Sequence, residues 1–353
     1  YDMLGRLSTK NLFAAGAQTP SETITVGFDE QGRQNIVTDA RGVTTTAFDV
    51  EGRLTQVASP EGTVNYEYDP VIGRKTKTFT ANSETRFTYD DLGRLETVVV
   101  AKRNGVVLTT HEVTTYAYTH VGGRESVTLP NGVQTTYQFD DLNRLTNLTN
   151  KNTISNQILS SYQYTLAANG RRTAVAETRL ESAGGLSTTN ITYSYDALNR
   201  LTLESSDSTI AVRDFSKQYV YDLVGNRQSR TTTGDKAEST SYFYNNNDQL
   251  ITEACNDADG SSTTTYGYDD NGSLTSKIKA GAKPETAAYT YNLENRLASA
   301  QIARRDSGHN VSINSTFKYN QAGIRTNAAS STSVNSGVAQ SASRSFLVDS
   351  MNH

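Results

Sequence analysis

Aromatic residues recur in pairs, two residues apart, at the ends of short Thr-rich stretches. Examples are "TTYAY", "TTYQF", "ITYSY", "TSYFY" and "AAYTY". Because successive side chains of a strand point to opposite faces, both aromatic residues of a pair face the same side of a sheet. Thr and Tyr also favour strands. Each stretch is therefore predicted to be a β-strand that ends on an aromatic residue.

A phrase of the form "YDxxGRL" begins at the second aromatic residue of each stretch. With that residue as position one, position two is Asp in nine units and Asn in three, with Thr119 and Thr165 as exceptions. Position five is Gly, Asn or Asp in 12 units, and an Arg follows in 12 units. The 14 units, spaced by 20 to 31 residues, begin at Tyr1, Phe28, Phe48, Tyr68, Tyr89, Tyr118, Phe139, Tyr164, Tyr195, Tyr221, Tyr244, Tyr268, Tyr291 and Tyr319.

Each position of the phrase has a local physical reason. Asp suits the first position of a type I turn, where its side chain accepts a backbone N–H. Gly suits the fourth position, and Asn replaces it because it tolerates the left-handed conformation. The chain then re-enters a strand through "RLT", so the phrase predicts a β-hairpin corner. Two strands per unit give on the order of 28 antiparallel strands and an all-β fold.

These positions define a structural repeat signature. It comprises Tyr1, Asp2, Gly5, Phe28, Asp29, Gly32, Phe48, Asp49, Gly52, Tyr68, Asp69, Gly73, Tyr89, Asp90, Gly93, Phe139, Asp140, Asn143, Tyr195, Asp196, Asn199, Tyr221, Asp222, Gly225, Tyr268, Asp269, Gly272, Tyr291, Asn292, Asn295, Tyr319, Asn320 and Gly323.

The segments between corners are polar and vary in length, as insertions on one edge of a stacked array do. We interpret residues 1–327 as the repeat array. Residues 328–345 are rich in Ser and Ala and are interpreted as a loop or linker. Residues 346–353 are interpreted as the start of a further strand that is truncated. Because the chain starts inside a copy of the phrase, we expect it to be a fragment of a longer protein.

Charge and composition limit the classes of molecule that the protein is expected to bind. A net charge of −4 and an isoelectric point near 5.7 provide no broad basic surface, which disfavours nucleic acid. No stretch approaches the roughly 20 apolar residues of a membrane span. The N-terminal stretch lacks the features of a signal peptide. The single cysteine, Cys255, cannot form an internal disulfide and is interpreted as a small apolar residue.

Near-matches to catalytic and metal motifs fail on spacing. "HEVTT" at His111 begins like a zinc-protease motif, but Thr115 stands where the second His is required. The four His residues show no ligand spacing. "NDADGSS", with Asp257 and Asp259, resembles a calcium loop but places Cys255 at the first ligand position, so an Asp-Gly hairpin turn is the better interpretation. We expect no catalytic, cofactor or metal residue.

The tandem "YDxxGRL" corner, with an aromatic residue two positions earlier, resembles the YD-repeat or Rhs-repeat family over residues 1–327. That family includes bacterial Rhs polymorphic toxins, insecticidal toxin complex B and C components and the teneurins. The resemblance implies a β-sheet strip wound as a spiral, β-solenoid-like shell around a C-terminal toxic domain, here a partial shell. It also implies an aspartyl autoprotease core with Asp-Pro motifs after the repeats. The motif "DPxG" does not occur in this sequence. Its one Asp-Pro pair, Asp69-Pro70, lies inside a repeat.

The resemblance implies a non-catalytic, secreted or cell-surface segment that encapsulates or scaffolds a cargo polypeptide. The alternative is a surface-exposed adhesin or carbohydrate-binding module, because rows of Tyr can stack on sugars. The recurrence of an aromatic ring in every unit, including those at both ends, favours packing between neighbouring hairpins over a ligand surface. The expected partner is therefore a toxin or other cargo polypeptide, with surface glycans as the partner under the alternative.

Overall fold

The computed structural model describes residues 1–234, 236–306, 308–335, 337 and 339–346, and the end of the interpreted further strand, residues 347–353, lies outside these. The first 14 strands are β1 (Thr9–Leu12), β2 (Glu22–Phe28), β3 (Gln34–Asp39), β4 (Gly42–Phe48), β5 (Leu54–Ser59), β6 (Gly62–Tyr68), β7 (Lys75–Phe79), β8 (Glu84–Tyr89), β9 (Leu95–Arg103), β10 (Val106–Tyr118), β11 (Arg124–Thr128), β12 (Val133–Phe139), β13 (Leu145–Asn152) and β14 (Gln157–Leu166).

The other 14 are β15 (Arg172–Leu180), β16 (Leu186–Tyr195), β17 (Leu201–Ser208), β18 (Phe215–Tyr221), β19 (Arg227–Gly234), β20 (Glu238–Tyr244), β21 (Leu250–Asp257), β22 (Gly260–Tyr268), β23 (Leu274–Gly281), β24 (Glu285–Tyr291), β25 (Leu297–Asp306), β26 (His309–Tyr319), β27 (Arg325–Val334) and β28 (Gln340–Ser345). Within the described residues, one 3₁₀ turn, η1 (Ala211–Arg213), is the sole helical segment.

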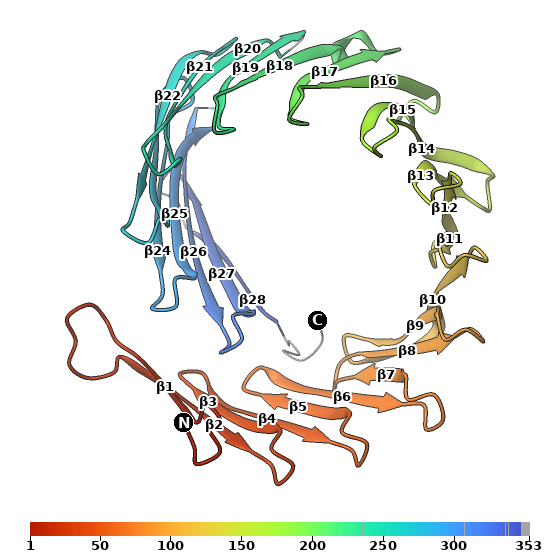
Figure 1. The fold of residues 1–353 in the computed structure, drawn as a ribbon, viewed down its shortest axis with the longest axis vertical. Helices are drawn as coiled ribbons and strands as arrows, with labels where there is room; N and C mark the ends of the chain where they lie inside the picture. Colours follow the sequence, from red (N-terminus) through yellow and green to blue (C-terminus); the bar gives the residue numbers. More distant parts are fainter. Residues whose placement is uncertain (235, 307, 336, 338, 347–353) are drawn as a thin grey trace. The chain divides into compact units, whose positions relative to one another are not determined.

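The fold class is confirmed as all-β, with strands that pair antiparallel with their neighbours in the chain (Figure 1). The chain forms two compact units. Unit 1 contains residues 1–86, 101–108 and 265–353, and unit 2 contains residues 87–100 and 109–264. Strand pairing in unit 2 runs from β10 to β21, and unit 1 contains β1–β7 and β23–β28. The repeat array is therefore a succession of hairpins in both units.

At ten corners the register of the hairpin shifts by one residue at the aromatic residue of position one, and at the corner that begins at Tyr164 the shift falls at Leu166. The shift lies between Gln138 and Phe139 in the β12–β13 pair and between Thr290 and Tyr291 in the β24–β25 pair. One extra residue in a strand produces such a bulge and increases the local twist. The corner therefore fixes the register of every hairpin that it joins.

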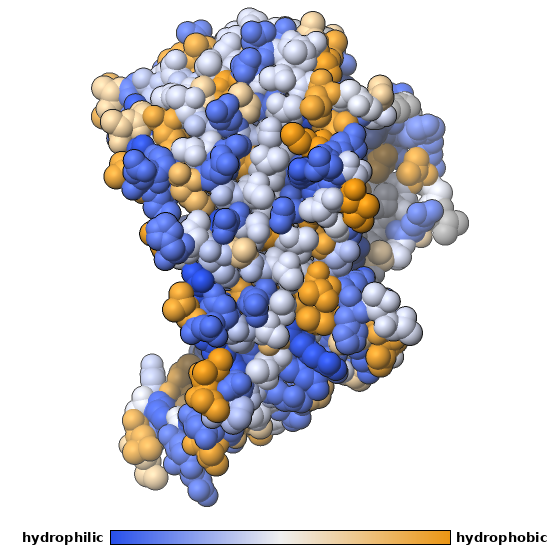
Figure 2. All heavy atoms as spheres, turned by 90° about the vertical axis from the view of Figure 1, so that its right-hand side faces the viewer, coloured by the Kyte–Doolittle hydropathy of each residue, from blue (hydrophilic) through white to orange (hydrophobic). Residues whose placement is uncertain are grey.

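The buried interior is thin and differs along the chain. Unit 1 holds an apolar cluster of Leu54, Val57, Val64 and Tyr66, against which Phe48 and Tyr68 pack. Unit 2 buries polar side chains, including Thr189, Ser206 and Thr240. Figure 2 shows hydrophobic residues in small separate groups among hydrophilic ones on the face turned to the viewer.

The Ser/Ala-rich stretch contains strands, which corrects its interpretation as a loop or linker. Most of it lies in β27 and β28, which pair from Thr332 opposite Gln340 to Asn327 opposite Ser345. The backbone N–H and C=O groups of Ser and Ala can form the hydrogen bonds of a β-ladder as well as those of any other residue. Pairing with a neighbouring strand therefore overrides the weak β-propensity of these side chains. The limits of the repeat array remain a prediction.

Candidate functional site

The corner adopts the predicted turn, shown here by the unit that begins at Tyr89. The Gly93 N–H donates to the Asp90 carbonyl oxygen at 2.7 Å, and the Asp90 N–H donates to the Arg94 carbonyl oxygen at 2.9 Å. Gly93 has a φ of 72°, and Asn143, at the same position of a later unit, has a φ of 59°. Both values lie in the left-handed region, which confirms why Gly and Asn occupy position five.

The Asp of position two holds the turn with both carboxylate oxygens. Oδ1 of Asp90 accepts from the backbone N–H groups of Leu92 at 3.0 Å and Arg94 at 2.8 Å, and Oδ2 accepts from Arg94 Nε at 2.7 Å. The backbone N–H of Arg94, with its side chain, lowers the pKa of Asp90 below 3.8. The pKa values of Asp2, Asp29, Asp49, Asp69, Asp140, Asp196 and Asp222 are lowered too.

Asn performs the backbone part of this role at three corners. In the unit that begins at Tyr291, Oδ1 of Asn292 accepts from the backbone N–H groups of Glu294 at 3.0 Å and Arg296 at 2.9 Å. The turn therefore depends on an oxygen acceptor at position two and not on a negative charge. This arrangement suits a turn better than acid–base chemistry, in which an amide cannot replace a carboxylate.

The arginine of position six connects one corner to the next, a role that the sequence analysis did not assign. In six of the seven units with an arginine at position six, its guanidinium lies over the position-one ring of the following unit within the range of a cation–π contact. The centroid distances are 4.1 Å for Arg6 over Phe28, 4.5 Å for Arg33 over Phe48, 5.0 Å for Arg53 over Tyr68, 4.7 Å for Arg94 over Tyr118, 4.9 Å for Arg200 over Tyr221 and 6.0 Å for Arg296 over Tyr319.

The tyrosine of the following unit returns a hydrogen bond. Its hydroxyl donates to the backbone carbonyl oxygen of the residue after the corner, at 2.8 to 3.0 Å. The pairs are Tyr68 with Leu54, Tyr118 with Leu95, Tyr195 with Arg172, Tyr221 with Leu201, Tyr244 with Arg227, Tyr291 with Leu274 and Tyr319 with Leu297. A buried tyrosine hydroxyl needs such a partner, and here the partner belongs to the previous unit.

The described signature residues form a row of corners and not one cluster. Most of their rings are half-buried, as at Tyr89, and Tyr1 is 85% exposed. Tyr66 and Tyr242, two residues before a corner, are buried. The aromatic rings therefore pack between consecutive units but do not replace an aliphatic core, which unit 1 retains. A recurrence of Arg at position six in seven units is the signal that could have revealed the connection.

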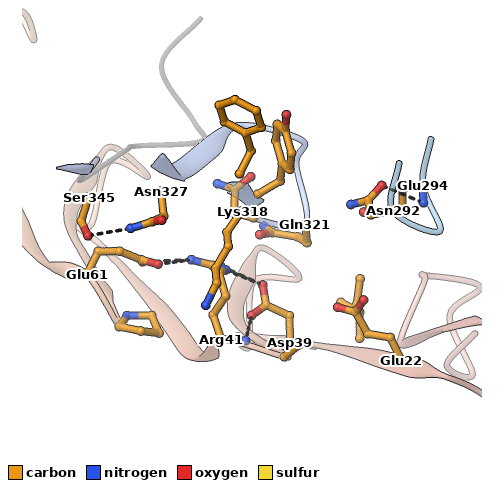
Figure 3. Close-up of a pocket in the computed structure, with 16 residues that line it drawn as sticks. Glu22, Asp39, Arg41, Glu61, Asn292, Glu294, Lys318, Gln321, Asn327 and Ser345 are labelled. Carbon is orange, nitrogen blue, oxygen red and sulfur yellow. Dashed lines mark hydrogen bonds and ion pairs between the residues drawn. The ribbon is translucent and has the colours of Figure 1, made fainter. Parts of the chain in front are cut away.

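A pocket of about 530 Å³ in unit 1 gathers charged side chains from β2, from the turns after β3, β5 and β24, and from β26, while β27 and β28 contribute the polar Asn327 and Ser345 (Figure 3). Arg41 donates to Asp39 at 2.7 Å and to Glu61 at 2.9 Å. Nearby, Lys10 and Glu294 form an ion pair at 2.5 Å. These ion pairs join segments that are distant in sequence, and we interpret the pocket as part of the packing between them.

The rejected motifs fold as expected. His111 lies in β10, and Asp257 and Gly260 flank a two-residue turn between β21 and β22 in which the Asp259 N–H donates to Asp257 at 2.8 Å. Over the described ranges, no group of three or more His, Cys, Asp or Glu could hold a metal ion. No helix of the described residues has the length and apolarity of a membrane span. Cys255 is a free thiol.

Comparisons with known proteins agree with this geometry. Residues 122–154 match the family model described as RHS Repeat. The fold of the chain, an array of antiparallel YD hairpins, is similar to part of the Photorhabdus luminescens Tc holotoxin pore containing a TccC3 variant. The TM-score is 0.59 at 15% identity, over 90% of this chain and 20% of that chain. The resemblance to Rhs-repeat proteins is therefore confirmed in sequence over residues 122–154, and most of the chain shares its fold with part of the Tc holotoxin chain.

A second structure, TcdB2–TccC3–Cdc42, matches with a TM-score of 0.47 at 11% identity, over 94% of this chain and 22% of that chain. The chain thus spans about a fifth of the length of each matched chain. No curated protein matches the sequence.

Proposed function

We propose that the chain is a non-catalytic structural segment of an Rhs/YD-repeat protein, which forms part of a hollow β-shell around a toxin or effector polypeptide. Residues 1–327 are the array, and the signature residues serve its packing. The protein is secreted or displayed at the cell surface as part of a larger polypeptide. Its partner is the cargo domain of the same or an associated protein.

The observation that carries this proposal is the repeated connection between corners. A guanidinium, a tyrosine hydroxyl or both join consecutive units at nine of the 13 junctions, and the same groups recur too often for a single catalytic centre. Fold similarity to a Tc holotoxin chain supports the same role. An array whose units are stabilised by contacts with one another needs no bound ligand for its stability. It can therefore enclose a polypeptide without binding it tightly.

Limited proteolysis of the full-length gene product, followed by mass spectrometry, tests the proposal. We expect the polypeptide outside the array to resist protease until urea unfolds the array, because a shell excludes the protease. Digestion at the rate of that polypeptide expressed alone would contradict encapsulation. Saturable, selective binding of this chain on a glycan array would instead support the adhesin alternative.

A further inference from the structure

The junction between the units that begin at Tyr118 and Phe139 lacks both connections that join other corners. Position six of the first unit is Gly123, which supplies no guanidinium. Position one of the second unit is Phe139, which has no hydroxyl to donate. Position two is Thr119, whose hydroxyl accepts the Gly123 N–H at 3.0 Å and so replaces only the backbone role of Asp.

The next arginine in the chain does not fill the vacant position. Arg124, at position seven, lies over Tyr116 of its own hairpin at 5.7 Å. Over the described residues, no guanidinium or ammonium group lies over the ring of Phe139 within cation–π range. The preceding ring, Tyr118, is covered by Arg94 at 4.7 Å.

A pocket of about 890 Å³ in unit 2 occupies this place. Its lining includes the rings of Tyr118, Tyr137 and Phe139, and the acidic residues Glu125 and Asp141. A Cβ atom added at Gly123 would lie 3.5 Å from Phe139 Cε2 and 3.4 Å from Asn143 Oδ1. The same Cβ atom would lie 3.3 Å from Thr119 Oγ1, so a side chain at Gly123 would begin in contact with three residues that line the pocket, and the glycine leaves the ring of Phe139 without such a cover.

We propose that this pocket binds the guanidinium group of an arginine side chain from a partner polypeptide. The chain itself shows what such a ring accepts, because the equivalent rings at Phe28 and Phe48 are covered by guanidinium groups at 4.1 and 4.5 Å. At those corners an Asp carboxylate fixes the guanidinium. In the pocket, Glu125 and Asp141 offer the corresponding negative charge, and planar bidentate pairing favours arginine over lysine.

The site does not depend on the proposed shell, because the binding of a peptide can be measured on this chain alone. A ligand-observed NMR titration would use acetyl-Gly-Arg-Gly-amide, with the citrulline and lysine peptides as matched ligands. The citrulline peptide has nearly the same shape without the charge. We expect it to bind at least about tenfold more weakly than the arginine peptide, and the lysine peptide to lie between them. Citrulline or lysine binding equal to that of arginine would overturn the assignment.

Variants locate the site. Gly123→Arg should place the chain's own guanidinium beside Phe139 and abolish peptide binding, and the unfolding temperature is measured in parallel because the new Cβ atom would lie 3.3 Å from Thr119 Oγ1. Thr119→Asp combined with Gly123→Arg rebuilds the complete corner and gives the same test if the single variant folds poorly.

Asp141→Asn should weaken binding several-fold. Asp91→Asn is the matched control, because Asp91 holds the same corner position in the unit that begins at Tyr89, and it should leave binding unchanged. Binding that survives Gly123→Arg in a folded protein would contradict the proposal.

Discussion

The hairpins of β4–β6 in unit 1 and of β16–β17 in unit 2 have the same corner above different interiors. Arg53 and Arg200 both pair with the Asp of their corner at 2.6 Å. Below the first corner, Val57 and Val64 face each other across two strands and are buried. Below the second, Thr189 pairs with Ser208 through a 2.8 Å hydrogen bond. The corner therefore forms the same turn and ion pair whether the residues buried next to it are apolar or polar.

The largest expected effect separates the two interiors. Tyr66→Ala removes a buried ring from the apolar cluster and should destabilise the protein by about 3–5 kcal/mol. Thr189→Ala in unit 2 removes one hydroxyl and should cost only about 1–2 kcal/mol. Urea unfolding of both variants measures the difference. Equal losses would mean that the polar interior carries as much stability as the apolar one.

The next effect should be the same in both regions, because it arises in the corner. Gly52→Val and Gly93→Val each place a β-branched residue at a φ of 83° or 72°, and each should cost about 1–3 kcal/mol. The comparison of unfolding midpoints in the two units is the measurement. A silent variant in either unit would show that the turn is not required there.

Acid should weaken both regions through their carboxylates. In unit 1 the backbone N–H groups of Ile72 and Val71 lower the pKa of Asp69 below 3.8, and in unit 2 the pKa of Glu181 is lowered from 4.5 to about 2 by Arg213 and Ser187. A lowered folded-state pKa gives stability that is present above the unfolded value and is lost as pH falls. The thermal midpoint should therefore hold down to about pH 5 and fall between about pH 4.5 and 2. Glu181→Gln should reduce this fall, and an unchanged profile would count against the role of the pair.

The smallest effect is expected for Asp90→Asn. Asn292 makes the same backbone bonds at its own corner, so the turn survives and only the Arg94 side-chain contact changes. The midpoint should shift by less than about 2 °C, well below the shift of Gly93→Val. A larger shift for Asp90→Asn than for Gly93→Val would require a functional explanation of the repeated carboxylates.

Local features of the fold were predictable and contacts between units were not. The turn at Asp90 and Gly93 depends on four neighbouring residues, so sequence alone predicts it. The contact of Arg94 with Tyr118 spans 24 residues and depends on the register of the intervening strands, which is not encoded in the corner. The strands of residues 328–345 were missed because their partners, and not their own propensities, hold them. The pocket beside Phe139 was missed because no sequence motif describes an aromatic ring whose covering arginine is absent.

The connections between corners have a direction. Arg94 reaches forward to Tyr118, and the Tyr118 hydroxyl reaches back to Leu95, so the later unit completes groups that the earlier unit has already placed. A chain that leaves the ribosome from its N-terminus offers each new hairpin a prepared docking surface as it emerges. Nearest-neighbour coupling of this kind lets an array assemble by stepwise growth from its first turn, and the junction at Gly123 is a place where that growth receives less help from the preceding unit.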